Sequence, residues 1–293
     1  MLGELIFIGV RGIGLGALFA LVAMGFNIVH RSSHVLNFAQ GNILVLGGLG
    51  AFLFYTDGTG AAPWLLALLG VTALLGLLVS AQGWLTLLPL RYSSEQDSWL
   101  ITTMAASVII EAGLLLTQGP FVRSTQSPFP SVTVYGMRTP APYLLSIALM
   151  IAWYLALRWF LSRTVTGLAI SALSQDFDAA RAAGLRVRRL QVLAFAISGL
   201  ILGSAGFVAA PVITIAPAAG LQYVVNGFIA AVIGGMGSNT GALLGGPIVG
   251  VISMFATYQV GGEFQGIILL LVMVAVLMVR PQGLFGNAAA RRV

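Results

Sequence analysis

The sequence consists mainly of apolar runs that are each long enough, or nearly long enough, to cross a lipid bilayer. A spanning helix needs about 20 predominantly apolar residues, and every backbone polar group must be satisfied inside the segment. Such runs cover Leu5–Val29, Val35–Tyr55, Pro63–Leu88, Trp99–Gln118, Tyr143–Leu161, Gln191–Ala210 and Gln265–Val279, and a glycine-rich stretch covers Asn226–Gly250. The sequence therefore predicts an all-α polytopic membrane protein with about 7–9 transmembrane helices.

Composition excludes several classes of protein. Charged residues make up 8% of the chain, against roughly 25% in soluble domains. The sequence contains no cysteine, which excludes disulfides, thiolate metal sites and cysteine nucleophiles. The net charge of +6 is carried entirely by arginines that flank the apolar runs. This pattern indicates orientation in membrane lipid and no nucleic-acid partner.

The polar loop Ser162–Leu190 gives the chain its orientation. It contains five arginines, which are Arg163, Arg181, Arg186, Arg188 and Arg189. Basic loops favour the cytoplasmic side, so this loop is expected inside. Alternation then places His30–His34, Pro89–Ser98 and the C-terminal tail inside, and the N-terminus, Asp57 and the proline-bearing loop Gly119–Pro142 outside. In that outer loop, SVTVYG has a β-like pattern.

A short helix is predicted within the cytoplasmic loop. Ser174 or Asp176 can cap its first turn, the helix continues through Ala183, and Gly184 can end it. A short helix of small residues fits a docking surface for a partner. The alternative is a solvated connector whose arginines only set the topology.

The second apolar run begins with the polar sequence NFAQGN, which holds Asn37, Gln40, Gly41 and Asn42. Amides at this depth must pair or face a polar path. We therefore expect a broken or re-entrant start to this span, with the three amides facing a translocation cavity. The alternative is that they only satisfy a broken backbone.

The glycine-rich stretch is interpreted as two apolar half-runs joined by Gly234–Gly241. If both half-runs cross, the chain has nine spans, whereas a re-entrant hairpin gives seven. Gly234, Gly235, Gly237 and Gly241 are candidates for lining the path by close backbone approach, or else they only pack helices. Two small-residue pairs, Gly12/Gly16 and Gly199/Gly203, also predict close helix contacts.

The sequence offers little catalytic chemistry. Its two histidines lie in the polar turn His30–His34, and no span carries two acids. Glu111 is the one acid inside an apolar run, where it can serve an ion-coupled carrier or simply pair with a hydroxyl or with Arg123. The glycine stretch lacks the ending of a phosphate-binding loop. Active transport without an ion gradient would need energy from a partner.

Three segments resemble the inner-membrane permease subunits of branched-chain amino acid ABC importers, in particular the H-type leucine/isoleucine/valine permease. They are GIGLGALFALVAMGFNIVHRSSHVLNFAQGNILVLGG, which includes the N-F-A-x-G turn, AAVIGGMGSNTGALLGGPIVG, and the closing motif RPQGLFG. The resemblance runs nearly end to end. It implies that the loop Ser162–Leu190 carries a coupling helix that seats in a groove of the ATPase subunit.

The resemblance assigns coupling to Asp176, Asp178, Ala179, Ala180, Arg181, Ala183 and Gly184. In this hypothesis Asp178 and Arg181 make polar contacts with the ATPase, while Ala179, Ala180 and Ala183 form a close-packed face. The chain would be a single permease domain (1–293), with a cytoplasmic coupling loop (162–190) and a periplasmic loop (119–142). It would be multi-pass in the bacterial inner membrane.

The implied function is the membrane subunit of a binding-protein-dependent importer of branched-chain amino acids. The implied partners are ABC ATPase subunits, a second, M-type permease subunit and a periplasmic substrate-binding protein. The chain itself would not be an enzyme and would need no cofactor or metal. The alternatives are a permease for urea or short amides and an ion-coupled secondary carrier.

Overall fold

The structure is a computed structural model that describes residues 2–55, 60–87, 98–134 and 137–286. Its elements are α1 (Leu2–Ser33), α2 (Gln40–Phe54), α3 (Ala61–Thr86), α4 (Ser98–Gln118), β1 (Val132–Val134), β2 (Met137–Thr139), α5 (Ala141–Arg163), α6 (Val165–Leu173), α7 (Phe177–Ala182), α8 (Val187–Ala209), α9 (Gly220–Gly234), α10 (Asn239–Gln259) and α11 (Gln265–Val279). Two short 3₁₀ turns precede α9 and α11. The all-α prediction is confirmed.

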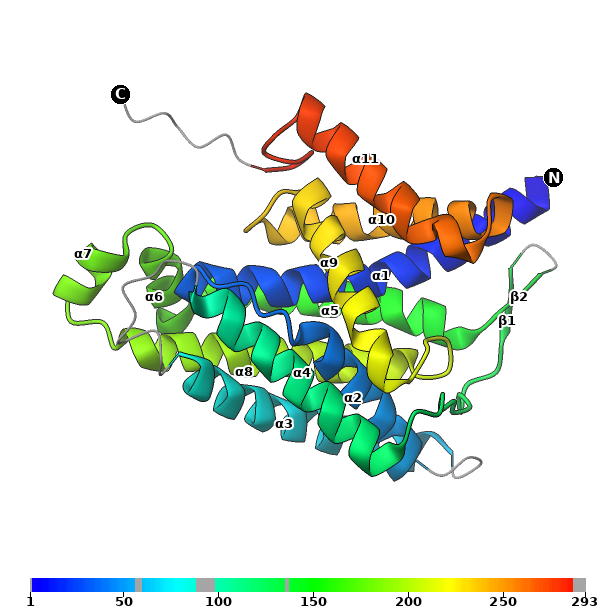
Figure 1. The fold of residues 1–293 in the computed structure, drawn as a ribbon, viewed down its shortest axis with the longest axis horizontal. Helices are drawn as coiled ribbons and strands as arrows, with labels where there is room; N and C mark the ends of the chain where they lie inside the picture. The colour runs from blue at the N-terminus through cyan, green and yellow to red at the C-terminus, as the bar shows by residue number, and fades with distance from the viewer. Residues whose placement is uncertain (1, 56–59, 88–97, 135–136, 287–293) are drawn as a thin grey trace.

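Helices α1, α5, α8 and α10 run roughly along the longest axis of the molecule, while α9 crosses it steeply (Figure 1). The short helices α6 and α7 lie at one end, named here the α7 end. The N-terminus and strands β1 and β2 lie at the other, named the hairpin end. β1 and β2 pair antiparallel, with Val132 opposite Thr139, as the β-like pattern predicted. The opposite placement of the two polar loops agrees with the predicted alternation.

Eight helices of the described chain are long and apolar enough to cross a membrane, and α2 is a shorter apolar helix. The count fits the predicted range of about 7–9. The glycine-rich half-runs extend further than expected, because α9 begins at Gly220 and α10 continues to Gln259. The junction is also shorter than Gly234–Gly241, since both of those glycines are helical and only residues 235–238 separate the helices. Both half-runs therefore belong to helices long and apolar enough to span a membrane, which favours two crossings over a re-entrant hairpin.

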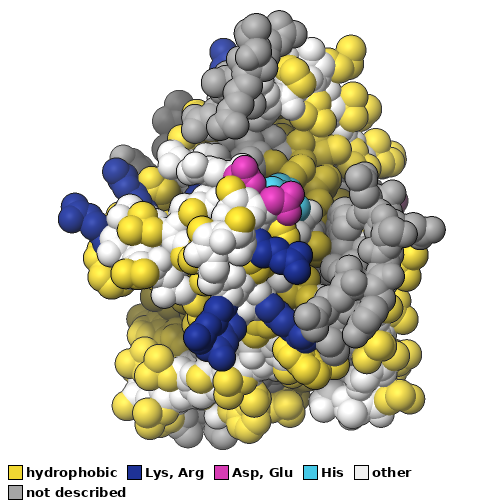
Figure 2. Space-filling model, turned by 90° about the vertical axis from the view of Figure 1, so that its left-hand side faces the viewer, with side chains coloured by type: hydrophobic (Ala, Val, Ile, Leu, Met, Phe, Trp, Pro, Cys, Tyr) yellow, Lys and Arg dark blue, Asp and Glu magenta, His cyan; other side chains and the backbone are white. Residues whose placement is uncertain are grey.

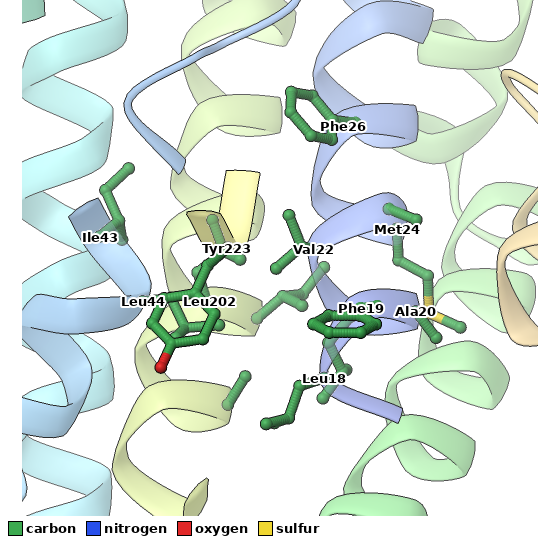
Figure 3. Close-up of a cluster of buried hydrophobic side chains, with 14 of the residues drawn as sticks. Leu18, Phe19, Ala20, Val22, Met24, Phe26, Ile43, Leu44, Leu202 and Tyr223 are labelled. Carbon is green, nitrogen blue, oxygen red and sulfur yellow. The ribbon is translucent and has the colours of Figure 1, made fainter. Parts of the chain in front are cut away.

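Helix α1 lies at the centre of the bundle and packs against α10, α8, α9 and α5. Its middle stretch, Ala17–Met24, is at most 1% exposed. Figure 3 shows side chains from this stretch beside Ile43 and Leu44 of α2, Leu202 of α8 and Tyr223 of α9. An apolar helix buried on all sides is the signature of a bundle core.

Glycines make the contact between α1 and α10 a contact of backbones. A β-carbon on Gly16 would lie 2.5 Å from the carbonyl oxygen of Gly246 and 2.6 Å from the Cα of Pro247. One on Gly12 would lie 2.7 Å from the Cα of Val251. The predicted Gly12/Gly16 packing pair is confirmed, and α10 is its partner.

The second predicted pair, Gly199/Gly203, is likewise a helix contact. A β-carbon on Gly199 would lie 2.6 Å from the carbonyl oxygen of Leu75 on α3. Gly203 faces both α3 and Gly47 of α2, where a β-carbon on Gly47 would lie 2.6 Å from the Gly203 carbonyl oxygen. These contacts hold α2, α3 and α8 together as a second tightly packed group.

Candidate functional site

Helix α7 has the capping groups that the sequence predicted. Asp176 is its N-cap, and Asp176 Oδ1 accepts a hydrogen bond of 2.9 Å from the backbone N–H of Ala179. Gly184 follows the helix with a φ of +81°, a left-handed conformation that glycine adopts without strain. The N–H of Leu185 then donates to the Ala180 carbonyl at 3.2 Å, and that of Gly184 to the Arg181 carbonyl at 3.1 Å. This pairing is a Schellman motif, which ends the helix sharply.

The exposed side of α7 differs from the expected one at a single residue. Asp178, Ala179, Arg181 and Ala183 are exposed, while Ala180 is only 6% exposed and belongs to the hydrophobic core. Of the three alanines expected to form a close-packed face, Ala179 and Ala183 are therefore exposed and Ala180 is not. Ala180 turns inward because α7 must bury one side to stay attached to the bundle.

A helix that was not predicted, α6, supports α7. The hydroxyl of Thr164 caps it by accepting a 3.0 Å hydrogen bond from the N–H of Gly167. Helix α6 packs against α5, α7 and the end of α1. The N-cap signal of Thr164 was present in the sequence. The polar composition of the whole segment 162–190 favours a loop, so the sequence does not predict α6.

A cavity of about 1140 Å³ opens at the α7 end. The cavity is bounded by the end of α1, the last turns of α5, helix α6 and the α9–α10 turn. Its lining is largely polar and includes His30, Arg31, His34, Tyr154, Arg158, Ser171, Ser174, Gln175, Ser238, Asn239 and Thr240. None of its described lining residues is acidic. Figure 2 shows this end of the molecule, with dark-blue arginine side chains spread around its hollows.

The predicted break at the start of the second span is confirmed. The chain leaves α1 at His34, has no regular secondary structure over residues 35–37, and enters α2 only at Gln40. With 15 residues, α2 rises about 22 Å, less than the ~30 Å of a bilayer core. Thr103 of α4 donates a 3.2 Å hydrogen bond to the carbonyl of Leu36, so protein covers part of this irregular backbone.

The three amides join the start of α2 and the segment before it to three different helices. Asn37 and Gln82 of α3 form a reciprocal pair, in which Gln82 Nε2 donates to Asn37 Oδ1 at 3.0 Å. Gln40 Nε2 donates to Ser198 Oγ of α8 at 3.0 Å. Asn42 Nδ2 donates to the carbonyl and the hydroxyl of Ser107 on α4, at 2.7 and 2.9 Å. In this conformation the amides act as polar contacts between helices.

All three amides are at most 1% exposed, and none of them lines the cavity at the α7 end. Gly41 is equally enclosed, because a β-carbon there would collide with the carbonyl of Gly220. The side-chain oxygens of Gln40 and Asn42 are buried without a hydrogen-bond partner. This burial favours the packing role in the present conformation and leaves two acceptors unsatisfied.

The α9–α10 turn is held on one side by α1. Asn27, 1% exposed, accepts a 2.9 Å hydrogen bond from the N–H of Gly237 and donates one of 3.1 Å to the carbonyl of Ser238. Arg31 donates from Nε and Nη2 to the carbonyl of Gly237, at 3.1 and 3.0 Å. Asn27 and Arg31 were not predicted as site residues, since nothing local in the sequence links them to residues 237–238.

The closing motif holds the same turn on its other side. The N–H of Leu284 donates to the carbonyl of Ile233 at 2.8 Å, and that of Phe285 to Gly234 at 3.2 Å. A β-carbon on Gly283 would lie 2.6 Å from the backbone nitrogen of Gly235. RPQGLFG thus caps the last turn of α9.

The four candidate path glycines have different surroundings. Gly234 and Gly241 face each other so closely that a β-carbon on either would collide with the carbonyl of the other. Gly235, with a φ of +103°, packs against Gly286. Gly237 is the one that borders the cavity at the α7 end. Three of these glycines therefore serve backbone packing in this conformation, and one lines a cavity.

Glu111 is half-buried on α4. No hydrogen bond or ion pair joins it to Arg123 within the described residues. Arg123 instead donates from Nη2 to the carbonyl of Gln118 at 3.1 Å and lies 5.3 Å from the centre of the Phe52 ring. The suggested Glu111–Arg123 pair is not formed.

A bundle of long apolar helices around the buried helix α1, with a capped surface helix at one end and a broken span, defines a polytopic membrane protein. Residues 8–277 match the family described as branched-chain amino acid transport system / permease component. The chain belongs to this family. It is therefore a multi-pass protein of the bacterial inner membrane.

The chain is 25% identical to the high-affinity branched-chain amino acid transport system permease protein BraD of Pseudomonas aeruginosa, over 97% of this chain and 96% of the relative. It is 26% identical to the permease protein LivH of Escherichia coli K12, with the same coverage. Among solved structures it resembles PsaBC from Streptococcus pneumoniae in complex with Fab, with a TM-score of 0.52 at 13% identity over 96% of this chain and 97% of that one. That last likeness shows the fold alone.

Proposed function

We propose that this chain is the transmembrane permease subunit of a binding-protein-dependent ABC importer that moves branched-chain amino acids across the inner membrane. The observation that carries the proposal is the family match over residues 8–277. The capped, partly exposed helix α7 between two spans supports it. ABC ATPases and a substrate-binding protein are the partners that such an importer requires.

The α7 end is assigned to the cytoplasm. Arg163 ends α5, Arg181 and Arg186 lie between α5 and α8, and Arg188 and Arg189 lie in the first turn of α8. Basic segments at the ends of spans are retained on the cytoplasmic side. The hairpin end, with residues 119–142, is then periplasmic and available to a binding protein. We treat residues 1–293 as one transmembrane domain with these two extramembrane parts.

In this proposal α7 seats in a groove of the ATPase. Asp178 and Arg181 are exposed charges suited to polar contacts, and Ala179 and Ala183 allow close approach. Asp176 and Gly184 fix the two ends of the helix, while Ala180 anchors it to the bundle. Movement of the ATPase would reach the bundle through α6, which contacts the end of α1.

We further propose that the start of α2 and the α9–α10 turn border the solute path when the cavity opens. The candidates are Asn37, Gln40, Gly41 and Asn42, together with Gly234, Gly235, Gly237 and Gly241. The buried acceptors of Gln40 and Asn42 support this, since an unpaired acceptor costs about 1–3 kcal/mol and gains a partner if the site becomes wet. Gly237, at the cavity edge, is the other support.

The remaining assignments concern partners and chemistry. A second permease subunit of the M-type would complete the transmembrane pathway with this chain. The chain would perform no reaction on the solute and would use no cofactor or metal of its own. ATP hydrolysis by the attached subunits would supply the energy.

Reconstitution tests the proposal directly. The chain is placed in proteoliposomes with its candidate second permease, ATPases and binding protein, and uptake of labelled leucine and of labelled urea is measured. Leucine uptake that requires both ATP and the binding protein is the expected result. Preferential uptake of urea would support the short-amide alternative. Uptake that persists without ATP and collapses with the ion gradient would support a secondary carrier.

A further inference from the structure

A second groove, of about 760 Å³, lies between the end of α3 and the start of α8. Ser80 and Trp84 of α3 form one wall, and Val192, Leu193 and Ala196 of α8 form the other. Its mouth at the α7 end is made by the segment 186–189, which carries Arg186, Arg188 and Arg189. The groove is thus cationic at one end and apolar along its length.

Arg188, which lines this groove, has unsatisfied donors. Its Nε and Nη2 atoms are buried and make no hydrogen bond, and no acid is present among the groove's described lining residues. A buried polar group without a partner is destabilising, and more so when it is charged. An anionic group bound in the groove would supply the hydrogen-bond acceptor that the Arg188 guanidinium lacks.

The aromatic ring beside Arg188 places the groove at a membrane interface. The guanidinium carbon of Arg188 lies 5.2 Å from the centre of the Trp84 ring, within the range of a cation–π contact. Trp84 is 48% exposed and sits in the last turns of α3. Tryptophans at the ends of spanning helices typically lie at the level of the lipid headgroups.

The start of α8 adds a second attraction for an anion. Helix α8 begins at Val187, and its N-cap residue, Arg186, makes no side-chain cap hydrogen bond. The N–H groups of Val187, Arg189 and Leu190 already donate to the carbonyls of Leu185 and Arg186. The attraction that remains is the positive end of the helix dipole. Three arginine side chains and this helix end therefore point to an anionic group at the same place.

We propose that this groove binds an anionic phospholipid of the cytoplasmic leaflet. Its phosphodiester headgroup would pair with Arg188 and the first turn of α8, and an acyl chain would lie along Val192, Leu193 and Ala196. A ligand with a charged end and a long apolar body matches both parts of the groove. Leu77 and Leu85 of α3, which are 70% and 57% exposed, continue the lipid-facing surface.

The position of the groove gives the lipid a structural consequence. Only residues 183–186 separate α7 from α8. A lipid that fixes the first turn of α8 would also restrict where α7 can lie. Anionic lipid would thereby stabilise the presentation of α7 to its ATPase partner.

The test uses the permease purified with its ATPase subunits in detergent. The complex is loaded with equal amounts of phosphatidylglycerol and phosphatidylcholine, and retained lipid is measured by native mass spectrometry. Wild type should retain phosphatidylglycerol in preference, and Arg188→Gln should lower that retention about fivefold. Arg163→Gln removes the same charge from an exposed position at the same end and should leave retention unchanged.

Four results would overturn the proposal. They are equal retention of the two lipids, unchanged retention in Arg188→Gln, full displacement of lipid by inorganic phosphate, and loss of the ATPase subunits from Arg188→Gln even at a lipid concentration that restores its phosphatidylglycerol retention. The third would mark a free-anion site and the fourth a contact with the ATPase.

A second measurement uses the wild-type chain, in case Arg188→Gln does not fold. Phosphatidylglycerol with brominated acyl chains should quench tryptophan fluorescence more than brominated phosphatidylcholine. The excess quenching should disappear in Trp84→Phe. Equal quenching by the two lipids would contradict the proposed site.

Discussion

The guanidinium group of Arg31 donates two hydrogen bonds to the carbonyl oxygen of Gly237, at 3.1 and 3.0 Å. These residues are far apart in the sequence, and Asn27 binds the same turn one helical turn earlier on α1. The end of α1 and the α9–α10 turn therefore form one hydrogen-bonded unit at the edge of the large cavity. Any displacement of α1 by α6 must move this turn or break these bonds.

Replacing Arg31 by methionine removes both bonds while keeping an apolar stem. Hydrogen bonds to charged groups are worth about 1.5–3 kcal/mol, so the free energy that holds the α9–α10 turn against α1 should fall by roughly that amount. We expect lower thermal stability of the purified complex and reduced uptake. Arg163→Met, at an exposed position of the same end, is the matched control. Equal stability of the two variants would show that the Arg31 bonds contribute nothing.

Variants of Gln40 and of its partner Ser198 can distinguish a role of the amides in the solute path from a role in helix packing. Gln40→Leu and Ser198→Ala each remove the same 3.0 Å hydrogen bond, at a cost of about 1 kcal/mol. If Gln40 borders the solute path in another conformation, Gln40→Leu should impair leucine uptake by at least about tenfold more than Ser198→Ala. Folding and ATPase binding should be unchanged in both. Equal uptake in the two variants would leave Gln40 with a packing role only.

The contact between α1 and α10 should not tolerate a single added methyl group. Gly16→Ala places a β-carbon 2.5 Å from the carbonyl oxygen of Gly246, against backbone that cannot rotate away. Overpacking of this kind costs about 1–3 kcal/mol or more. We expect poor yield and a lowered melting temperature. Gly9→Ala on the same helix meets no atom within 4 Å and should be tolerated. A similar loss of yield and melting temperature in both variants would indicate an effect on the geometry of α1 and not on its contact with α10.

The absence of cysteine from the chain allows a direct test of α7. A cysteine at Ala179 should react with impermeant maleimide from the cytoplasmic side and form a disulfide with a cysteine placed in the ATPase groove. A cysteine at Ala180, which is 6% exposed, should be labelled far less. The yield of the Ala179 cross-link should change with ATP. Labelling without any cross-link would identify the loop as a plain connector.

The presence of the spans and the caps of α7 could be predicted from the sequence because their causes are local. Asp176 and Gly184 lie next to the helix that they cap, and Gly12/Gly16 is a spacing along one helix. The broken start of α2 was likewise evident from three amides in an apolar run. Each of these features depends on residues within a few positions of one another.

The pairings between distant residues could not be predicted in the same way. Asn37 meets Gln82, and Arg31 meets Gly237, only because the helices pack in this order. The inward turn of Ala180 depends on how α7 rests on the bundle. The glycines of α9 and α10 suggest breaks when the sequence is considered alone, whereas in the structure most of them are helical and pack closely against α1 or between α9 and α10.

Gly12 and Gly16 meet Gly246, Gly250 and Val251 without an intervening long side chain. Helices slide past one another when side chains at their boundary can exchange rotamers. The contact between α1 and α10 contains almost no long side chains that could change rotamer. We therefore expect α1 and α10 to move together as one rigid body during a transport cycle. The sliding surfaces then lie elsewhere, at helices such as α4 and α11, which bury little of themselves in this chain.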